Sequence, residues 1–378
     1  MARLASLLLG AMLILGLHAA QMPTEAATPN PIAPGYLRTS GSKILDSQGR
    51  EVRILGINWF GLSAATRAPH GLWARNYKSM VAQMASMGFN TLRLLYSNDM
   101  LDDGPESVSA VNFSLNPELV NKSPLQIMDL VIAAAGAEGM RVILDNHSVE
   151  PDAIHGKWYN ATFTEAQWIA DWKKVATRYK NNPTVIGADL FNEPSGTWGT
   201  GGQDDWARAA KAAGNAIHSV TGNWLIIVEG IRQWNDNWYW WGGGLEPVKT
   251  MPIVLNKSGR LVYSPHDYPG SVSDQPWFHD PDYPNNLPAV WEKHWGFIET
   301  QNIAPLLIGE FGSTFGDAAE IGWADTIAAY IKAKGIDWMY FPFNANGLPY
   351  MGVLNPDWTT INPSRQTYLS NLIANTKK

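Results

Sequence analysis

Two glutamates stand at the ends of short apolar runs and are the strongest candidates for chemistry. The run 185–191 ends at Asn192 and Glu193, just before a proline, and the run 305–309 ends at Glu310. Enzymes built on parallel strands place their reactive groups at the carboxyl ends of those strands. One such glutamate is equally well an ordinary charge at a strand end. Two in matching settings indicate a hydrolase that works with a pair of carboxylates.

The elements that must position these glutamates alternate between strand and helix. A hairpin is predicted at 36–52, with its turn at 47–50. Eight apolar runs then predict strands at 52–60, 91–96, 140–146, 186–193, 225–229, 261–268, 306–310 and 338–344. Helices are predicted at 75–87, 124–137, 164–179, 204–220, 290–300, 323–334 and 366–376. The alternation favours an α/β fold, a closed (β/α)8 barrel with a short N-terminal hairpin. An open doubly wound sheet is the alternative, but no glycine-rich phosphate loop follows a strand.

The other predicted strand ends carry further polar and aromatic groups. Arg93 is either a buried ion-pair partner or the cation that keeps one glutamate charged. His147 and His266 are expected to contact ligand or tune a pKa rather than to be core histidines, because both lie at strand ends beside the glutamates. Asp145, Asp189 and Glu229 are expected to hold structure. No metal is expected, since no His-Glu-x-x-His run occurs, and a Gly-x-Ser-x-Gly nucleophile is also missing.

Composition narrows the class of protein. The chain has 378 residues and contains no cysteine, which excludes thiolate zinc sites and cysteine nucleophiles. Its formal net charge of −6 gives no sign of a nucleic-acid partner. Its 18 tryptophans indicate either a tryptophan-rich core or a cleft lined with flat rings that suit sugars.

The chain begins with a candidate targeting segment. Arg3 precedes an apolar run at 4–17 that is too short to span a bilayer, and small residues follow it. We therefore expect a secretory signal peptide at 1–27, a disordered leader at 28–35 and one catalytic domain at 36–378. The mature protein is expected to be a secreted monomer with no membrane contact.

Several motifs are similar to those of family 5 glycoside hydrolases, above all the secreted bacterial endo-β-1,4-glucanases (cellulases). They occur at 56–61 (GINWFG), 70–76 (HGLWARN), 88–94 (GFNTLRL), 190–194 (LFNEP) and 308–312 (IGEFG). The resemblance implies a (β/α)8 barrel that needs no cofactor and hydrolyses a β-1,4 linkage with retention. It also implies roles for single residues: Glu193 as general acid/base, Glu310 as nucleophile, Asn192 on the sugar 2-hydroxyl, and Arg93, His147, His266 and Tyr268 around them.

The chain departs from the family after the eighth predicted strand. The run 341–345 reads FPFNA where relatives commonly carry WSWNP. We expect Phe343 to take the place of the usual tryptophan as the sugar platform. Trp59, Trp73 and Trp198, with the group Trp234, Trp238, Trp240 and Trp241, are expected to form outer subsites, although core packing explains any one of them equally well.

The leading hypothesis is an endo-acting β-1,4-glucanase whose partner is a β-glucan polysaccharide or oligosaccharide. Two alternatives stay open. The chain could hydrolyse another β-glycan, such as mannan or xyloglucan, because family membership does not fix the sugar. It could also be a carbohydrate-binding protein with weak catalysis, given the altered segment after the eighth strand.

Overall fold

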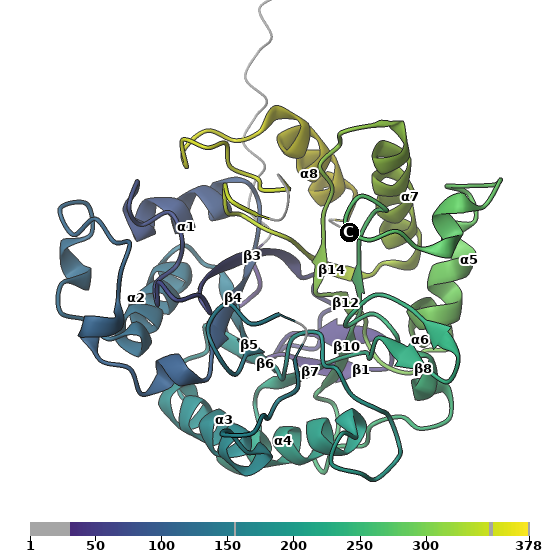
Figure 1. Ribbon diagram of the computed structural model, residues 1–378, viewed down its shortest axis with the longest axis horizontal. Coiled ribbons are helices and arrows are strands. Elements are labelled where there is room, and N and C mark those ends of the chain that lie inside the picture. The colour runs from purple at the N-terminus through teal and green to yellow at the C-terminus, as the bar shows by residue number, and fades with distance from the viewer. Residues whose placement is uncertain (1–30, 155, 348–350, 377–378) are drawn as a thin grey trace, which may run out of the picture.

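The computed structural model describes residues 31–154, 156–347 and 351–376, so the expected signal peptide lies outside the described residues. Eight parallel strands form a sheet in the order β10-β7-β6-β5-β4-β3-β14-β12, and a bridge between Tyr263 and Leu306 joins its two ends. The strands are β3 (Leu55–Leu62), β4 (Thr91–Ser97), β5 (Arg141–Ser148), β6 (Val185–Asp189), β7 (Leu225–Glu229), β10 (Leu261–Ser264), β12 (Leu307–Ile308) and β14 (Asp337–Tyr340). The predicted closed barrel is confirmed (Figure 1).

Helices surround the barrel on all sides (Figure 1). They are α1 (Tyr77–Ser86), α2 (Pro124–Ala137), α3 (Glu165–Tyr179), α4 (Trp206–Val220), α5 (Leu287–Trp291), α6 (Phe297–Thr300), α7 (Ala318–Lys334) and α8 (Pro363–Thr376). The single helix expected at 290–300 is instead α5 and α6, joined by a π-helical turn at Glu292–Gly296. Ser123 and Thr164 cap α2 and α3 through reciprocal side-chain and backbone hydrogen bonds, which explains why these helices start there.

The bottom of the barrel is closed by the N-terminal segment. Strands β1 (Arg38–Ser40) and β2 (Lys43–Leu45) pair with each other, and Leu37 and Ile44 pack against apolar side chains inside the barrel. The predicted turn at 47–50 is present, with a bridge between Leu45 and Glu51 and backbone hydrogen bonds from Asp46 to Arg50 and from Val52 to Ile44. The longer pairing, between β1 and β2, turns instead at 41–42. Ile32 is 4% exposed and belongs to the same cluster, so the expectation of disorder is wrong for this part of the leader.

Most tryptophans serve the core. Twelve of them are fully buried, which supports the tryptophan-rich core over the aromatic cleft as the main reason for this composition. Three also fasten the top of the barrel through their indole N–H groups. Trp168 donates to Asn146, Trp172 to the Leu190 carbonyl and Trp206 to the Glu229 carbonyl, over 2.8 to 3.0 Å. The helix layer thus holds the strand ends where the site lies.

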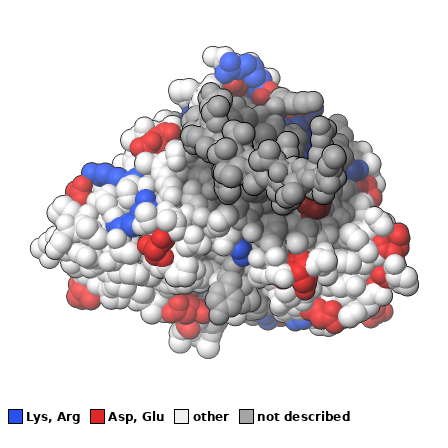
Figure 2. Space-filling model, turned by 90° about the horizontal axis from the view of Figure 1, so that it is seen from above, with Lys and Arg blue, Asp and Glu red and all other residues white. Residues whose placement is uncertain are grey.

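The outer surface carries both signs of charge. On the described part of the face in Figure 2, acidic and basic side chains are interspersed among uncharged ones. Within the described ranges, no helix has the length and apolar character needed to cross a bilayer.

Candidate active site

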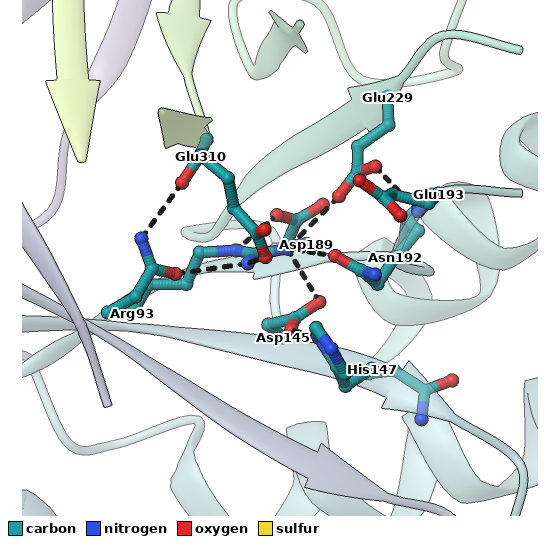
Figure 3. Close-up of polar contacts among 12 residues, drawn as sticks. Arg93, Asp145, His147, Asp189, Asn192, Glu193, Glu229 and Glu310 are labelled. Atoms are coloured by element: carbon teal, nitrogen blue, oxygen red, sulfur yellow. Dashed lines mark hydrogen bonds and ion pairs between the residues drawn. The ribbon is translucent and has the colours of Figure 1, made fainter. Parts of the chain in front are cut away.

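Arg93 is the centre of the polar groups at the top of the barrel. It lies on β4 with its side chain fully buried, and its guanidinium donates to Asp189 over 2.9 Å and to Glu229 over 3.0 Å. The guanidinium also donates to Glu310 over 2.5 Å, and it forms an ion pair with Asp145 at 3.0 Å. Figure 3 shows these carboxylates converging on the guanidinium from separate strands. A planar cation with five donors suits such a site, where a point charge would not.

The buried acidic groups stabilise the charged form of Arg93. Burial by itself would lower the pKa of Arg93, but Asp145, Asp189, Glu310 and Glu229 outweigh it and raise that pKa well above its usual value. Asp145, Asp189 and Glu229 lie close enough together to chelate a metal ion, and each of them contacts the guanidinium. The positive charge that these three carboxylates need is therefore supplied by a side chain of the protein.

Glu310 sits on the short strand β13 (Glu310–Phe311), held by two donors. Its Oε1 accepts from Arg93 and its Oε2 accepts from the Tyr268 hydroxyl over 2.8 Å. Burial and the charge of Glu310 raise the pKa of Tyr268 well above its usual value, so the phenol remains a donor. Two donors therefore hold both oxygens of this carboxylate, which is 4% exposed, in fixed positions.

Glu193 lies beyond β6, which ends at Asp189 rather than at the predicted residue 193. Its backbone has a φ of 46°, a left-handed conformation that is uncommon for a residue other than glycine. The Glu193 N–H donates to Glu229 Oε2 over 2.7 Å, and Glu193 Oε1 lies 3.0 Å from Nδ1 of His266. A buried carboxylate thus fastens the backbone that carries this glutamate.

His266 lies on the short strand β11 (His266–Asp267). Its imidazole packs between the carboxylates of Glu193, Glu229 and Glu310. Burial alone would lower its pKa, but Glu229 and Glu310, with hydrogen bonds to Glu193 and Glu229, raise that pKa well above its usual value. Gly309 and Gly242 leave the room that the imidazole needs. A Cβ at Gly309 would lie 2.9 Å from the His266 ring, and one at Gly242 would lie 2.5 Å from a Glu229 oxygen.

Asn192 and His147 complete the set around the glutamates. Asn192 Oδ1 accepts from Arg93 over 3.0 Å, which directs its NH2 group toward the pocket. His147 Nδ1 lies 2.7 Å from Asp145 Oδ2. Burial lowers the pKa of His147, but the Asp145 carboxylate outweighs it and raises that pKa.

A pocket of about 210 Å³ opens above these groups. Its polar lining is His147, Asn192, Glu193, Tyr268 and Glu310, and its apolar lining is Ile154, Trp240, Trp241, Val272, Phe341 and Met351. The structure therefore brings together seven of the predicted site residues: Arg93, His147, Asn192, Glu193, His266, Tyr268 and Glu310.

Three of the aromatic predictions are wrong. Trp59 is 0% exposed with its N–H bonded to the His70 carbonyl, and Trp198 is 1% exposed with its N–H bonded to the Met251 carbonyl. Phe343 is also 0% exposed. A ring with no accessible face cannot stack on a sugar, so all three serve the core.

Phe341 takes the place that was expected for Phe343. It lines the pocket, and its ring stacks on Phe60 at 6.0 Å between centroids. The row of rings continues from Phe60 to His70 at 5.1 Å and from His70 to Trp73 at 5.4 Å. Trp73 is 37% exposed, so its role in substrate binding stays a prediction.

Replacing Phe341 with alanine is expected to lower kcat/KM on cello-oligosaccharides by up to about tenfold, because a stacking face beside Glu310 is lost. Replacing Phe343 with alanine should instead cost about 3–5 kcal/mol of folding stability, because it empties a core site. Oligosaccharide kinetics and thermal unfolding of both variants test this division. It fails if folded Phe343→Ala loses substrate affinity while Phe341→Ala does not.

Comparisons with known proteins agree with this geometry. The family model described as Cellulase (glycosyl hydrolase family 5) matches residues 45–347. An endoglucanase of Paenibacillus polymyxa is 46% identical over 347 residues, which cover 90% of this chain and 87% of the relative. The major extracellular endoglucanase of Xanthomonas campestris is 40% identical over 350 residues, 89% of this chain and 71% of the relative.

Solved structures give the same result. The catalytic domain of the Xanthomonas campestris enzyme superposes with a TM-score of 0.85 at 39% identity, covering 90% of this chain and all of that one. An endocellulase of Pyrococcus horikoshii, solved in complex with cellotetraose, has a TM-score of 0.84 at 34% identity, covering 89% of this chain and 98% of that one. The chain therefore belongs to glycosyl hydrolase family 5, the cellulase family.

Proposed function

We propose that this protein is an endo-β-1,4-glucanase that cleaves internal bonds of cellulose or related β-glucans with retention of configuration. One observation carries the mechanism. Carboxylate oxygens of Glu193 and Glu310 and a ring nitrogen of His266 all lie within 4.8 Å of one another. Retaining glycosidases hold their carboxyl groups about 5–5.5 Å apart, whereas inverting ones keep about 6.5–9.5 Å to admit a water molecule.

In this mechanism Glu310 attacks the anomeric carbon and forms a covalent glycosyl-enzyme, while Glu193 gives its proton to the leaving oxygen. Glu193 then takes a proton from water, and that water displaces Glu310 from the sugar. Arg93 and Tyr268 hold the attacking oxygens of Glu310 in place. The Asn192 amide is directed to the pocket, where it can donate to the 2-hydroxyl as positive charge develops on the sugar ring.

The substrate assignment has separate support. Relatives at 40–46% identity are endoglucanases, and the related Pyrococcus horikoshii endocellulase binds cellotetraose. We also propose that the mature protein is a secreted monomer. The apolar segment at 4–17 and the extracellular location named for the Xanthomonas campestris relative support secretion.

The proposal is tested by reducing-sugar release from carboxymethyl cellulose, barley β-glucan, mannan and xyloglucan, with Glu310→Gln as the blank. We expect the highest rate on the β-1,4-linked glucans and retained configuration when the first product is observed by NMR. A higher rate on mannan or xyloglucan would show that this other glycan is the preferred substrate. Binding of glucan without release of sugar would favour the binding-protein alternative.

A further inference from the structure

Asp267 is a buried carboxylate that lies between two residues of the candidate active site. It is the second residue of β11, directly after His266 and directly before Tyr268, and it is 1% exposed. Successive side chains of a strand point to opposite faces. Because the His266 ring faces the glutamates, the Asp267 side chain faces the helix layer behind them.

Three donors from separate elements converge on this carboxylate. Its Oδ1 accepts from the Trp323 indole on α7 over 2.9 Å, and its Oδ2 accepts from the Trp291 indole at the end of α5 over 3.0 Å. Tyr239 directly follows β9 (Asn237–Trp238), and its hydroxyl also donates to Oδ2. The helices α5 and α7 lie side by side outside the barrel (Figure 1). Asp267 therefore joins its strand to two helices and to the segment after β9.

Asp267 differs from the carboxylates around Arg93 in having no cation beside it. Among the residues that the structure describes, no lysine, arginine or histidine forms an ion pair with it. Burial raises the pKa of Asp267 to about 7 and outweighs its three hydrogen bonds, which lower that pKa. A buried charge of this kind costs stability. What the carboxylate provides is geometry, because its two oxygens accept from three donors at once, whereas an amide has only one acceptor oxygen.

We propose that Asp267 is a positioning residue for the catalytic step, because it fixes β11 in the place from which its neighbours reach the two glutamates. His266 Nδ1 lies 3.0 Å from Glu193 Oε1. The Tyr268 hydroxyl donates to Glu310 Oε2 over 2.8 Å. The backbone of β11 also pairs with β13, which carries Glu310. A shift of β11 therefore disturbs the acid/base and the nucleophile together, and a displacement of about 1 Å suffices to lower a rate about 10²-fold.

Because this role belongs to the site of the proposed function, it rests on that proposal and extends it to the layer behind the pocket. The alternative is that Asp267 only stabilises the fold. A folded variant separates the two roles. Loss of an anchor for catalysis lowers kcat and changes the surroundings of His266, whereas loss of a purely structural group changes only the unfolding temperature.

Asp267→Asn is the main test. In either orientation of the new amide, its NH2 group faces an indole N–H, that of Trp323 or that of Trp291, so at least one hydrogen bond is lost. We expect kcat on cellohexaose to fall by about 10-fold to 10²-fold with little change in KM. Asp337→Asn is the matched control, because Asp337 is also buried and its pKa is also raised to about 7 by burial, but it begins β14 at the opposite end of the barrel. The kcat of this control should be unchanged.

Tyr239→Phe tests the same anchor without removing the charge of Asp267. It takes away one donor, so we expect kcat to fall by about threefold, in keeping with the loss of one neutral hydrogen bond. The NMR titration of the His266 ring should move to lower pH in this variant, because the ring shifts away from Glu229 and Glu310, which raise its pKa. Since the Asp267 carboxylate is retained, such a shift reports the position of the ring and not a lost charge.

The NMR titration needs no substrate, so it judges the anchor even if wild type cleaves no glucan and the proposed function fails. If Asp267→Asn does not fold, Tyr239→Phe decides alone by the same two measurements. The positioning role is overturned if kcat is unchanged in the folded variants, if the His266 titration does not move, or if Asp337→Asn loses as much activity as Asp267→Asn.

Discussion

Glu310→Ala is expected to lower kcat on β-1,4-glucans by about 10⁵-fold or more, because no covalent intermediate can form without the attacking carboxylate. Glu193→Ala is expected to lose about 10²–10⁴-fold on the same polymers, the range typical for a missing general acid. The two losses should differ in their dependence on the leaving group. In an aryl cellobioside with an acidic phenol, the phenolate leaves without needing a proton. Glu193→Ala should therefore still form the glycosyl-enzyme and release a burst of phenol. Glu310→Ala should release none.

Azide separates the two roles by stereochemistry. In Glu193→Ala, azide can displace Glu310 from the intermediate without a general base, so the product should be the β-glycosyl azide. In Glu310→Ala, azide can enter only the space left by the carboxylate and attack the substrate directly, so the product should be the α-glycosyl azide. NMR of the products decides, and the reverse pattern would exchange the two assignments. The exposed Glu106 gives the matched control, and Glu106→Gln should retain full activity and stability.

The two glutamates were predictable because a barrel strand has a simple sequence pattern, an apolar run that ends at a polar residue. Residues inside a parallel sheet are apolar on both faces, so the first polar side chain after such a run marks the strand end. Glu193 and Glu310 both stand there, although β6 itself ends earlier, at Asp189. Arg93 could be predicted as a site residue because it is a charged residue inside an apolar strand. A cation inside an apolar strand needs buried carboxylates, and the neighbouring strand ends offered them.

The aromatic residues could not be sorted in the same way. Seven of the eight residues of β3 are buried whichever face of the strand they occupy, so alternation does not say which ring faces the cleft. Phe341 and Phe343 lie two positions apart after β14, and only the packing of the segment decides that the first lines the pocket and the second joins the core. The exposed Trp238 and the buried Trp240 follow the turn of one hairpin, which the sequence does not specify.

Glu229 was expected to hold structure only, and the geometry gives it a more specific task. Its Oε2 accepts the backbone N–H of Glu193, whose left-handed φ needs such support. Its Oε1 accepts from Arg93 and lies 3.3 Å from Nε2 of His266. Because His266 Nδ1 also lies 3.0 Å from Glu193 Oε1, the charged ring forms an ion pair with each of the two carboxylates. Glu229 is therefore a positioning residue for the acid/base.

Glu229→Gln is expected to lower kcat by about 10²-fold with little change in KM, since a displacement of about 1 Å at the acid/base suffices for such a loss. The new amide has one acceptor oxygen where two were needed, so either the Glu193 N–H or one N–H of Arg93 loses the acceptor that Glu229 supplied. Loss of the carboxylate also removes the largest charge effect that raises the pKa of His266. That pKa should fall, so the NMR titration of the His266 ring should move to lower pH.

Asp189→Asn provides the matched comparison, because it removes an equally buried carboxylate from Arg93 but makes no hydrogen bond to Glu193 or His266. Both variants should unfold at lower temperature than wild type, since each leaves the Arg93 cation less well compensated. The NMR titration of the His266 ring should shift more in Glu229→Gln than in Asp189→Asn, because Glu229 lies 3.3 Å from the ring and has the largest charge effect on it. Equal shifts in the two variants would mean that Glu229 acts merely as one more negative charge near Arg93. If Glu229→Gln kept the wild-type kcat but unfolded at lower temperature, Glu229 would have only a structural role.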